Sequence, residues 1–121
     1  MAEILKINSM KRAAREMKRI GTSAGGIAEM APKAIFLSVR LNGVRNAIAN
    51  ILKQECLAVG ADAAVSRWTV NCTKPKTDVL LLGTIKQLRK VAGKMKRQPS
   101  ESPEIAGELA GVLAKAIKES K

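Results

Sequence analysis

The stretch TDVLLLGTIKQL, residues 77–88, contains the signals that decide the fold. The run DVLLL, residues 78–82, is continuously apolar after Asp78, which is typical of a strand that is covered on both faces. Thr84 follows this strand and, with Gln87 three residues later, forms the capping box that starts a helix. We expect this helix to run to about Arg97. Its inward-facing residues are expected to be Ile85, Leu88, Val91, Ala92 and Met95.

Two segments that precede this stretch have clear periodicity. Residues 34–41 alternate apolar and other side chains, which predicts a strand, and Asn42-Gly43 predicts a turn after it. Residues 44–59 place apolar side chains at helical spacing and are followed by Gly60, which predicts a helix with a glycine stop. The apolar face of this helix is expected to contain Val44, Ala47, Ile48, Ile51, Leu52 and Cys56.

The N-terminal third of the chain predicts three further segments. Residues 3–7, EILKI, have the composition of a short strand. A helix is expected from Met10 to Ile20, with Ser9 as its N-cap and Gly21 at the position that ends it. Residues 22–33 contain Gly25-Gly26 and Pro32, which predicts a turn-rich connection without a regular element.

The remaining segments lie on either side of the quoted stretch. Residues 63–72 predict a second extended region with the single tryptophan, Trp68, at the sheet edge, and residues 74–76 predict a loop. Residues 98–104 predict a linker, and Pro103 with the residue after it suits the first turn of a last helix. The apolar stripe of that helix is expected to contain Ile105, Leu109, Val112, Leu113 and Ala116.

This order of elements predicts one domain over residues 1–121, of the α/β or α+β class, with a three- or four-stranded sheet and about four packed helices. Connections of helical length favour right-handed crossovers between neighbouring parallel strands. The predicted core contains Ile35, Leu37, Val39, Ile48, Ile51, Leu52, Leu80, Leu82, Leu88, Val91, Leu109 and Leu113.

The composition excludes several kinds of chemistry. The chain has no histidine, so histidine-based acid–base catalysis, nucleophile activation by histidine and histidine metal sites are excluded. Its two cysteines cannot build a Cys₄ zinc site, and we expect no metal or cofactor. The start lacks a secretory pattern and no apolar run could span a membrane. We therefore expect a cytoplasmic protein with reduced thiols, Cys56 in the core and Cys72 the more exposed.

The net charge of +12 is concentrated in the helix after the quoted strand. Residues 84–98 contain six basic residues and no acidic residue, so this segment contributes half of the net charge. One interpretation is a surface for a polyanion, such as nucleic acid or a phosphorylated ligand, or for an acidic partner. The other interpretation is a solvated helix face. The basic stripe consists of Lys86, Lys90, Lys94 and Arg97, with Arg89 and Lys96 beside it.

Four runs of the sequence carry a resemblance to a known family. They are AEMAPKAIFLSVRLNGV at 28–44, ANILKQECLAVGADAAVSR at 49–67, VNCTKPKTDVLLLGTIKQLRKV at 70–91 and PEIAGELAGVL at 103–113. In this order and spacing they resemble the segment that precedes the catalytic barrel in a long form of bacterial dihydropteroate synthase. The likeness covers roughly residues 20–115, and its distinctive parts are NILKQE, GADAAVSR and TDVLLLGTIKQL.

In that family the joining of a pterin pyrophosphate to p-aminobenzoate belongs to a (β/α)₈ barrel, which needs about 250 residues. A chain of 121 residues cannot contain this barrel. The resemblance therefore implies an accessory or interaction domain linked to folate and pterin metabolism, without catalytic residues of its own and with a separate synthase barrel as partner. Ala61 replaces a glycine and Cys56 a methionine of the family pattern, and both changes are small and apolar.

Polar residues inside the distinctive runs are the candidate ligand contacts. Asn50, Lys53 and Gln54 are spaced i, i+3 and i+4, so they form one polar patch on the central helix. Asp62 follows that helix at a junction with the next extended segment, and Arg67 comes soon after. An alternative interpretation has Asn50 and Gln54 solvated, Asp62 capping a turn and Lys53 paired with a nearby acid.

The basic helix adds Thr84, Lys86 and Gln87 at its start to the candidate contacts, with Lys90 and Lys94 further along its stripe as ligand or partner contacts. Ligands of open α/β sheets bind beyond the carboxyl ends of the strands, near helix N-termini, so these residues suit a ligand site if the strand before them is parallel to its neighbours. Thr84 and Gln87 are otherwise explained as helix caps. The residues predicted to bind an anion or a pterin-like ligand are Lys53, Asp62, Arg67 and Thr84.

Overall fold

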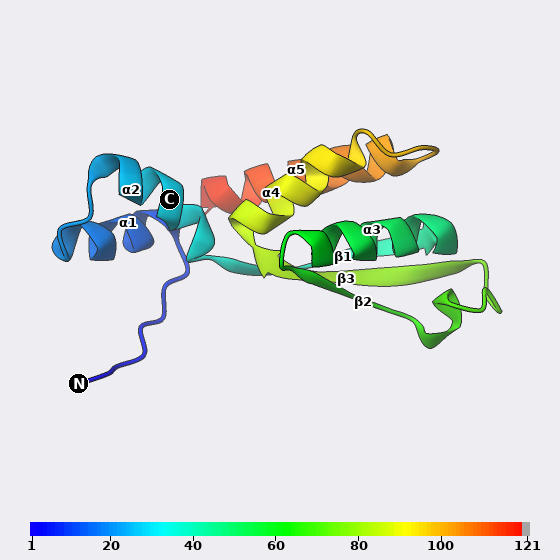
Figure 1. Cartoon of the computed structure of the whole chain (residues 1–121), viewed down its shortest axis with the longest axis horizontal. Coiled ribbons are helices and arrows are strands. Elements are labelled where there is room, and N and C mark those ends of the chain that lie inside the picture. Colours follow the sequence, from blue (N-terminus) through cyan, green and yellow to red (C-terminus); the bar gives the residue numbers. More distant parts are fainter. Residues whose placement is uncertain (120–121) are drawn as a thin grey trace.

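A computed structural model describes residues 1–119 of the chain, and these form an α+β fold with one three-stranded sheet (Figure 1). Helices α3, α4 and α5 lie on one side of the sheet, whereas α1 and α2 form a small lobe beside it. The elements in chain order are α1 (Met10–Arg19), α2 (Ala24–Met30), the 3₁₀ turn η1 (Ala31–Lys33), β1 (Phe36–Arg45), α3 (Asn46–Ala58), β2 (Asp62–Val65), the 3₁₀ turn η2 (Arg67–Thr69), β3 (Lys76–Thr84), α4 (Ile85–Met95) and α5 (Ser102–Glu119).

The strand order is β1-β3-β2, and β3 is antiparallel to both of its neighbours. The expectation of neighbouring parallel strands is therefore wrong. Helix α3 does connect two strands that run in the same direction, β1 and β2, but β3 inserts between them. Such a split β-α-β arrangement satisfies the crossover preference without making the two parallel strands neighbours.

Strand β3 alternates between buried and exposed side chains, so the expectation that it is covered on both faces is wrong. Val79 and Leu81 are fully buried against the helices, whereas Leu80 is 38% exposed and Leu82 is half-buried on the opposite face. The predicted core residues Leu80 and Leu82 thus belong to the open face. Because residues 79–82 are all apolar, the sequence itself does not show which face is buried.

Strand β1 continues through Asn42-Gly43, where the sequence predicts a turn. The pairing with β3 shifts register between Leu41 and Val44, as in a β-bulge. Gly43 has φ +63°, a conformation that glycine adopts without strain, and its N–H donates to Asp78 Oδ1 at 2.9 Å. The bulge consequently returns Val44 to the buried face, and α3 starts at Asn46 rather than at Val44.

The local signals for helix ends are confirmed. Ser9 Oγ accepts from the N–H of Arg12 at the start of α1, and the reciprocal capping box of Thr84 and Gln87 starts α4. Gly21 and Gly60, just beyond α1 and α3, have φ values of +91° and +85°. A residue with positive φ ends a helix, and glycine is favoured at this position because a side chain would be strained there.

Three irregular or extended predictions are wrong. Residues 22–33 form α2 and η1, because Ser23 caps α2 and Pro32 occupies the first turn of η1, where no N–H is needed. Residues 3–7 lie outside every helix and strand, with Ile4 94% exposed, and run away from the sheet beside α1 (Figure 1). The extended region predicted at 63–72 ends at Val65. The next N–H, that of Ser66, donates to the Thr77 hydroxyl, and η2 then begins.

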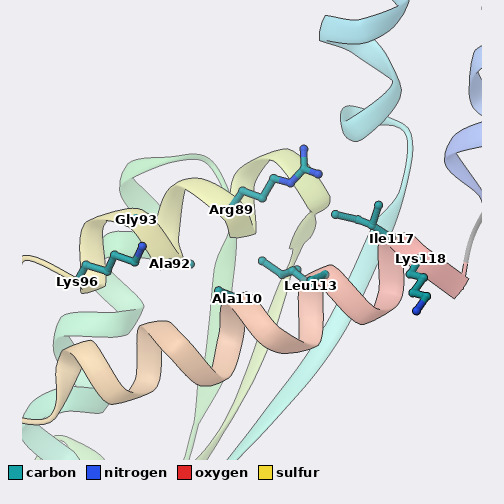
Figure 2. A pocket seen from close by; sticks show the side chains of 9 residues that line it. Arg89, Ala92, Gly93, Lys96, Ala110, Leu113, Ile117 and Lys118 are labelled. Carbon is teal, nitrogen blue, oxygen red and sulfur yellow. The ribbon is translucent and has the colours of Figure 1, made fainter.

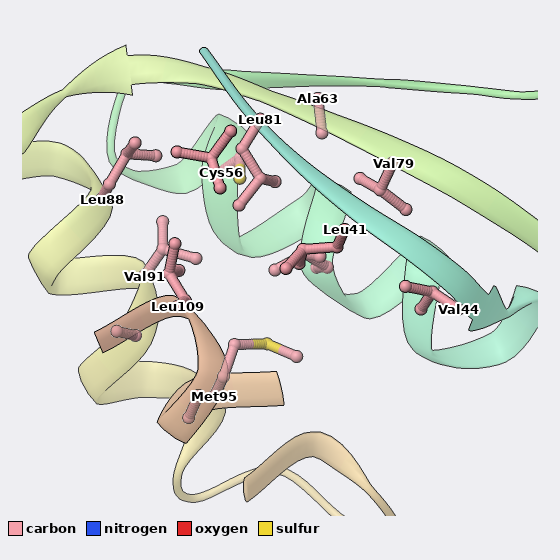
Figure 3. Close-up of a cluster of buried hydrophobic side chains, with 14 of the residues drawn as sticks. Leu41, Val44, Cys56, Ala63, Val79, Leu81, Leu88, Val91, Met95 and Leu109 are labelled. Carbon is pink, nitrogen blue, oxygen red and sulfur yellow. The ribbon is translucent and has the colours of Figure 1, made fainter. Parts of the chain in front are cut away.

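The core lies between the sheet and the helices α3, α4 and α5 (Figure 3). All five inward residues predicted for α4 are buried. On α5, Leu109 and Leu113 are buried as expected, but Val112 is exposed and Ala106 takes a core position. This helix already begins at Ser102, inside the predicted linker, and it packs beside α4.

Leu52 lies in the middle of α3 and is completely buried in this core. We predict that Leu52→Ala lowers the free energy of unfolding by about 2–5 kcal/mol, because burial is lost and a cavity remains. Urea denaturation followed by circular dichroism measures this value. A loss below about 0.5 kcal/mol, as for a surface substitution, would contradict the packing of α3.

Candidate functional site

A hollow of about 290 Å³ lies at the start of α4. Four of the predicted contacts line it, namely Thr84, Lys86, Gln87 and Lys90. They come together although β3 is antiparallel and not parallel to its neighbours. The hollow therefore arises from packing of η1 and the end of α3 around α4, not from an edge of parallel strands. Its lining residues are Lys33, Val59, Thr84, Lys86, Gln87 and Lys90.

An acid of α2 lies against the lysines of this hollow. Lys86 Nζ donates to Glu29 Oε1, and Lys33 Nζ is 4.0 Å from the same oxygen. The pKa of Glu29 is lowered, first by the hydrogen bond and charge of Lys86 and then by the charges of Lys33 and Lys90. Three ammonium groups thus interact with one carboxylate, and the net charge of the cluster is positive.

The distinctive runs of the sequence meet next to this hollow. A Cβ on Gly83 would lie 2.9 Å from the Cβ of Ala61, so β3 approaches the end of α3 too closely for a side chain. A Cβ on Gly60 would lie 3.2 Å from Gln87 Nε2. The capping box of α4 and the glycine stop of α3 therefore pack directly against each other, although they are distant in sequence.

Lys53 and Asp62 form a structural link between α3 and β2. Lys53 Nζ donates to Asp62 Oδ1 at 3.1 Å and to the carbonyl of Ala63 at 2.7 Å. Asp62 Oδ1 also accepts from the Ala63 N–H at 2.7 Å. Lys53 is thus paired with a nearby acid, as the alternative interpretation expects. Neither the Lys53 nor the Asp62 side chain lines the hollow.

Arg67 lies far from Thr84, so the four predicted ligand contacts do not form one site. It follows Ser66, whose N–H donates to Thr77, and Thr77 is near the opposite end of β3 from Thr84. A strand of that length places roughly 20 Å between the two levels. On α3, Asn50 and Gln54 are exposed and do not line the hollow.

A second and larger concavity, of about 680 Å³, lies between α4 and α5 (Figure 2). We call it the α4–α5 groove. Small and apolar side chains make its floor, while long basic side chains stand at its rim. The floor consists of Ala92, Gly93, Ala110, Leu113, Ala114 and Ile117, and the rim of Arg89, Lys96 and Lys118.

The sequence did not predict the groove, nor Lys33 in the wall of the hollow and Glu29 as the acid beside it. Glu29 and Lys33 lie in the segment that was predicted as an irregular connection, and only its tertiary contact with α4 brings them to the site. The groove did have a sequence signal: Ala106, Ala110 and Ala114 recur every four residues, which places small side chains on one face of α5. Lys94, predicted as a contact, lines neither concavity.

The thiols differ as expected. Both cysteines are free, and Cys56 is buried whereas Cys72 is exposed. Burial raises the pKa of the Cys56 thiol to about 11, which keeps it protonated and unreactive.

The single tryptophan, Trp68, lies just beyond edge strand β2. Its Nε1 donates to the Lys76 carbonyl, and Lys74 Nζ lies 4.3 Å from the centroid of its ring.

Comparison with models of protein families, with curated proteins and with solved structures finds no match to this chain. Within residues 1–119, no helix is long and apolar enough to cross a membrane.

The Asp62 link predicts a pH-dependent contribution to stability. The pKa of Asp62 is lowered, mainly by the hydrogen bond from the Ala63 N–H and also by Lys53. A carboxylate of this kind stabilises the fold above its ordinary pKa of 3.8, and the contribution is lost as the pH falls through the lower folded value. We predict that Asp62→Asn lowers the urea midpoint near neutral pH and that its difference from the wild type shrinks below pH 3.8.

The matched control is Glu108→Gln, which removes one exposed carboxylate from α5. It is expected to change the midpoint little at any pH, because an isolated surface charge contributes little. An Asp62→Asn deficit of equal size on both sides of its ordinary pKa would show that the carboxylate charge does not stabilise the junction.

Proposed function

We propose that the chain is a non-catalytic accessory domain of the dihydropteroate synthase type, which binds a separate synthase barrel through the α4–α5 groove. The resemblance of its sequence runs to the segment before that barrel supports the assignment to folate and pterin metabolism. The observation that carries the docking proposal is the groove itself, an apolar floor with a basic rim on an exposed face.

The floor of the groove suits a helix as the bound element. Gly93, Ala110 and Ala114 have little or no side chain, so the backbone of a partner helix can approach closely. A (β/α)₈ barrel presents a ring of helices on its outside. An exposed helix of such a barrel therefore has the shape that this groove accepts.

The rim of the groove defines the chemistry of the partner. Arg89 and Lys96 stand on the α4 side, and Lys118 stands near the end of α5 (Figure 2). Basic groups around an apolar centre favour a partner with an apolar stripe flanked by Asp and Glu, and they disfavour a basic surface. We therefore assign the groove to an amphipathic, acidic helix of the synthase barrel.

Gly93 offers a substitution that fills the groove without damage to the fold. A Cβ at this position meets no atom within 4 Å, and the residue lies inside α4. We predict that Gly93→Leu stabilises the chain by about 0.5–1 kcal/mol, since glycine is a poor helix former. The same change should weaken binding to the synthase barrel at least about tenfold, because the new side chain blocks the floor where contact is closest.

The matched control is Gly107→Leu on α5, where an added Cβ also meets nothing within 4 Å and the residue lies outside the groove. It should give a similar gain in stability with unchanged binding. Thermal unfolding and calorimetric titration with the barrel measure both quantities. Equal binding by the two variants, or failure of the wild-type chain to bind the barrel, would exclude this docking mode.

The exposed basic face of α1 favours a second candidate function, a small binding module for a polyanion such as nucleic acid. Five of the ten residues of α1 are basic and exposed. These are Lys11, Arg12, Arg15, Lys18 and Arg19. Such a face would contact phosphates along a backbone without reading sequence.

Titration with an oligonucleotide distinguishes this candidate from the docking proposal. Binding to a single-stranded oligonucleotide through α1 should weaken steeply with salt, and Arg15→Gln should reduce the slope of the log–log plot by about one. Gly93→Leu should leave this binding unchanged. Binding that is absent, or that does not change from low to moderate salt, removes the polyanion candidate.

A further inference from the structure

We propose that the hollow at the start of α4 is a binding site for the phosphoryl group of a small phosphorylated molecule, with Lys33, Lys86 and Lys90 as its cationic donors. Glu29 is its internal counter-ion, which the ligand displaces. The hollow shares no lining residue with the α4–α5 groove, so this inference does not depend on the docking proposal.

The first support is that the lysines already hold an oxyanion. Lys86 donates to the Glu29 carboxylate, and Lys33 lies 4.0 Å from it. Lys86 and Lys90 are one turn apart on α4, so their side chains share a face of the helix. The protein's own carboxylate thus shows which class of group this arrangement accommodates.

The second support is the charge balance. Three lysines and one carboxylate leave an excess of two positive charges around the hollow. A carboxylate supplies one negative charge, whereas a phosphoryl group supplies about −1.5 to −2 and three acceptor oxygens. A phosphoryl group therefore satisfies three ammonium donors better than Glu29 does, and it neutralises most of the charge.

The third support is the way in which the helix terminus is closed. The N–H of Ile85 donates to the Ile35 carbonyl at 3.0 Å, and the N–H of Gln87 donates to Thr84 Oγ1 at 3.2 Å. These two amides are already used within the fold, so the proposal places the donors on the lysine side chains. The Thr84 hydroxyl keeps its proton for donation, because its oxygen is the acceptor in the cap.

The size of the hollow favours a small molecule over a polymer. Its volume of about 290 Å³ is at the lower end of the range for small-molecule sites. The side chain of Val59 gives it one apolar wall. Glu29 is 63% exposed on the outer side, so its carboxylate can rotate into solvent when a ligand enters.

The test uses inorganic phosphate and pyrophosphate as probes, with affinity measured by calorimetry and location by amide shifts in NMR spectra. Glu29→Gln should raise the affinity for either probe about three- to tenfold, since one competing charge is removed. Lys90→Gln should lower it by a similar factor. The amide shifts should concentrate at Lys33 and at residues 84–90.

The controls change net charge equally but lie outside the hollow. Lys94→Gln lies one turn further along α4, and Glu108→Gln lies on α5. Equal effects of Lys90→Gln and Lys94→Gln, or of Glu29→Gln and Glu108→Gln, would overturn the proposal. Shifts spread over α1 would also overturn it, as would binding of an oligonucleotide at Lys90 without binding of either small probe. Circular dichroism confirms that each variant is folded.

Discussion

The pairing of β3 along both of its edges is the constraint on which the rest of the structure depends. Because β1 and β2 run in the same direction on either side of it, α3 has to cross β3 on one face. Val79 and Leu81 point to that face and receive α3, α4 and α5. The capping box at Thr84 then starts α4 at the last residue of β3, so the direction of the strand determines where the basic helix begins.

This one-sided arrangement also determines which surfaces are free to bind. The covered face leaves α4 with two exposed flanks, one toward η1, where the lysine hollow forms, and one toward α5, where the groove forms. The uncovered face of the sheet exposes Leu80 and Phe36 and is a third surface with apolar character. The hollow and the groove differ in chemistry, since charge dominates the first and small apolar residues dominate the second.

The parts of the fold that depend on local chemistry could be predicted from the sequence, and the parts that depend on distant pairing could not. The caps of α1 and α4 and the glycine stops of α1 and α3 follow from neighbouring residues, and all are confirmed. The buried face of β3 could not be predicted, because all residues from Val79 to Leu82 are apolar. The bulge in β1 could not be predicted either, because Asn42-Gly43 is equally typical of a turn and of a bulge. Likewise, Thr84, Lys86 and Lys90 were found together because one helix carries them, whereas Glu29 and Lys33 reach them only through tertiary packing.

The central functional claim is that the chain docks through the α4–α5 groove rather than through the open face of its sheet. Methyl NMR spectra of the chain, recorded with and without the dihydropteroate synthase barrel, test it most directly. The claim predicts that the methyl groups of Ala110, Leu113 and Ala114 shift, because they line the groove, while those of Leu80 and Leu82 stay unchanged. Shifts at Leu80 and Leu82 with none in the groove would contradict it.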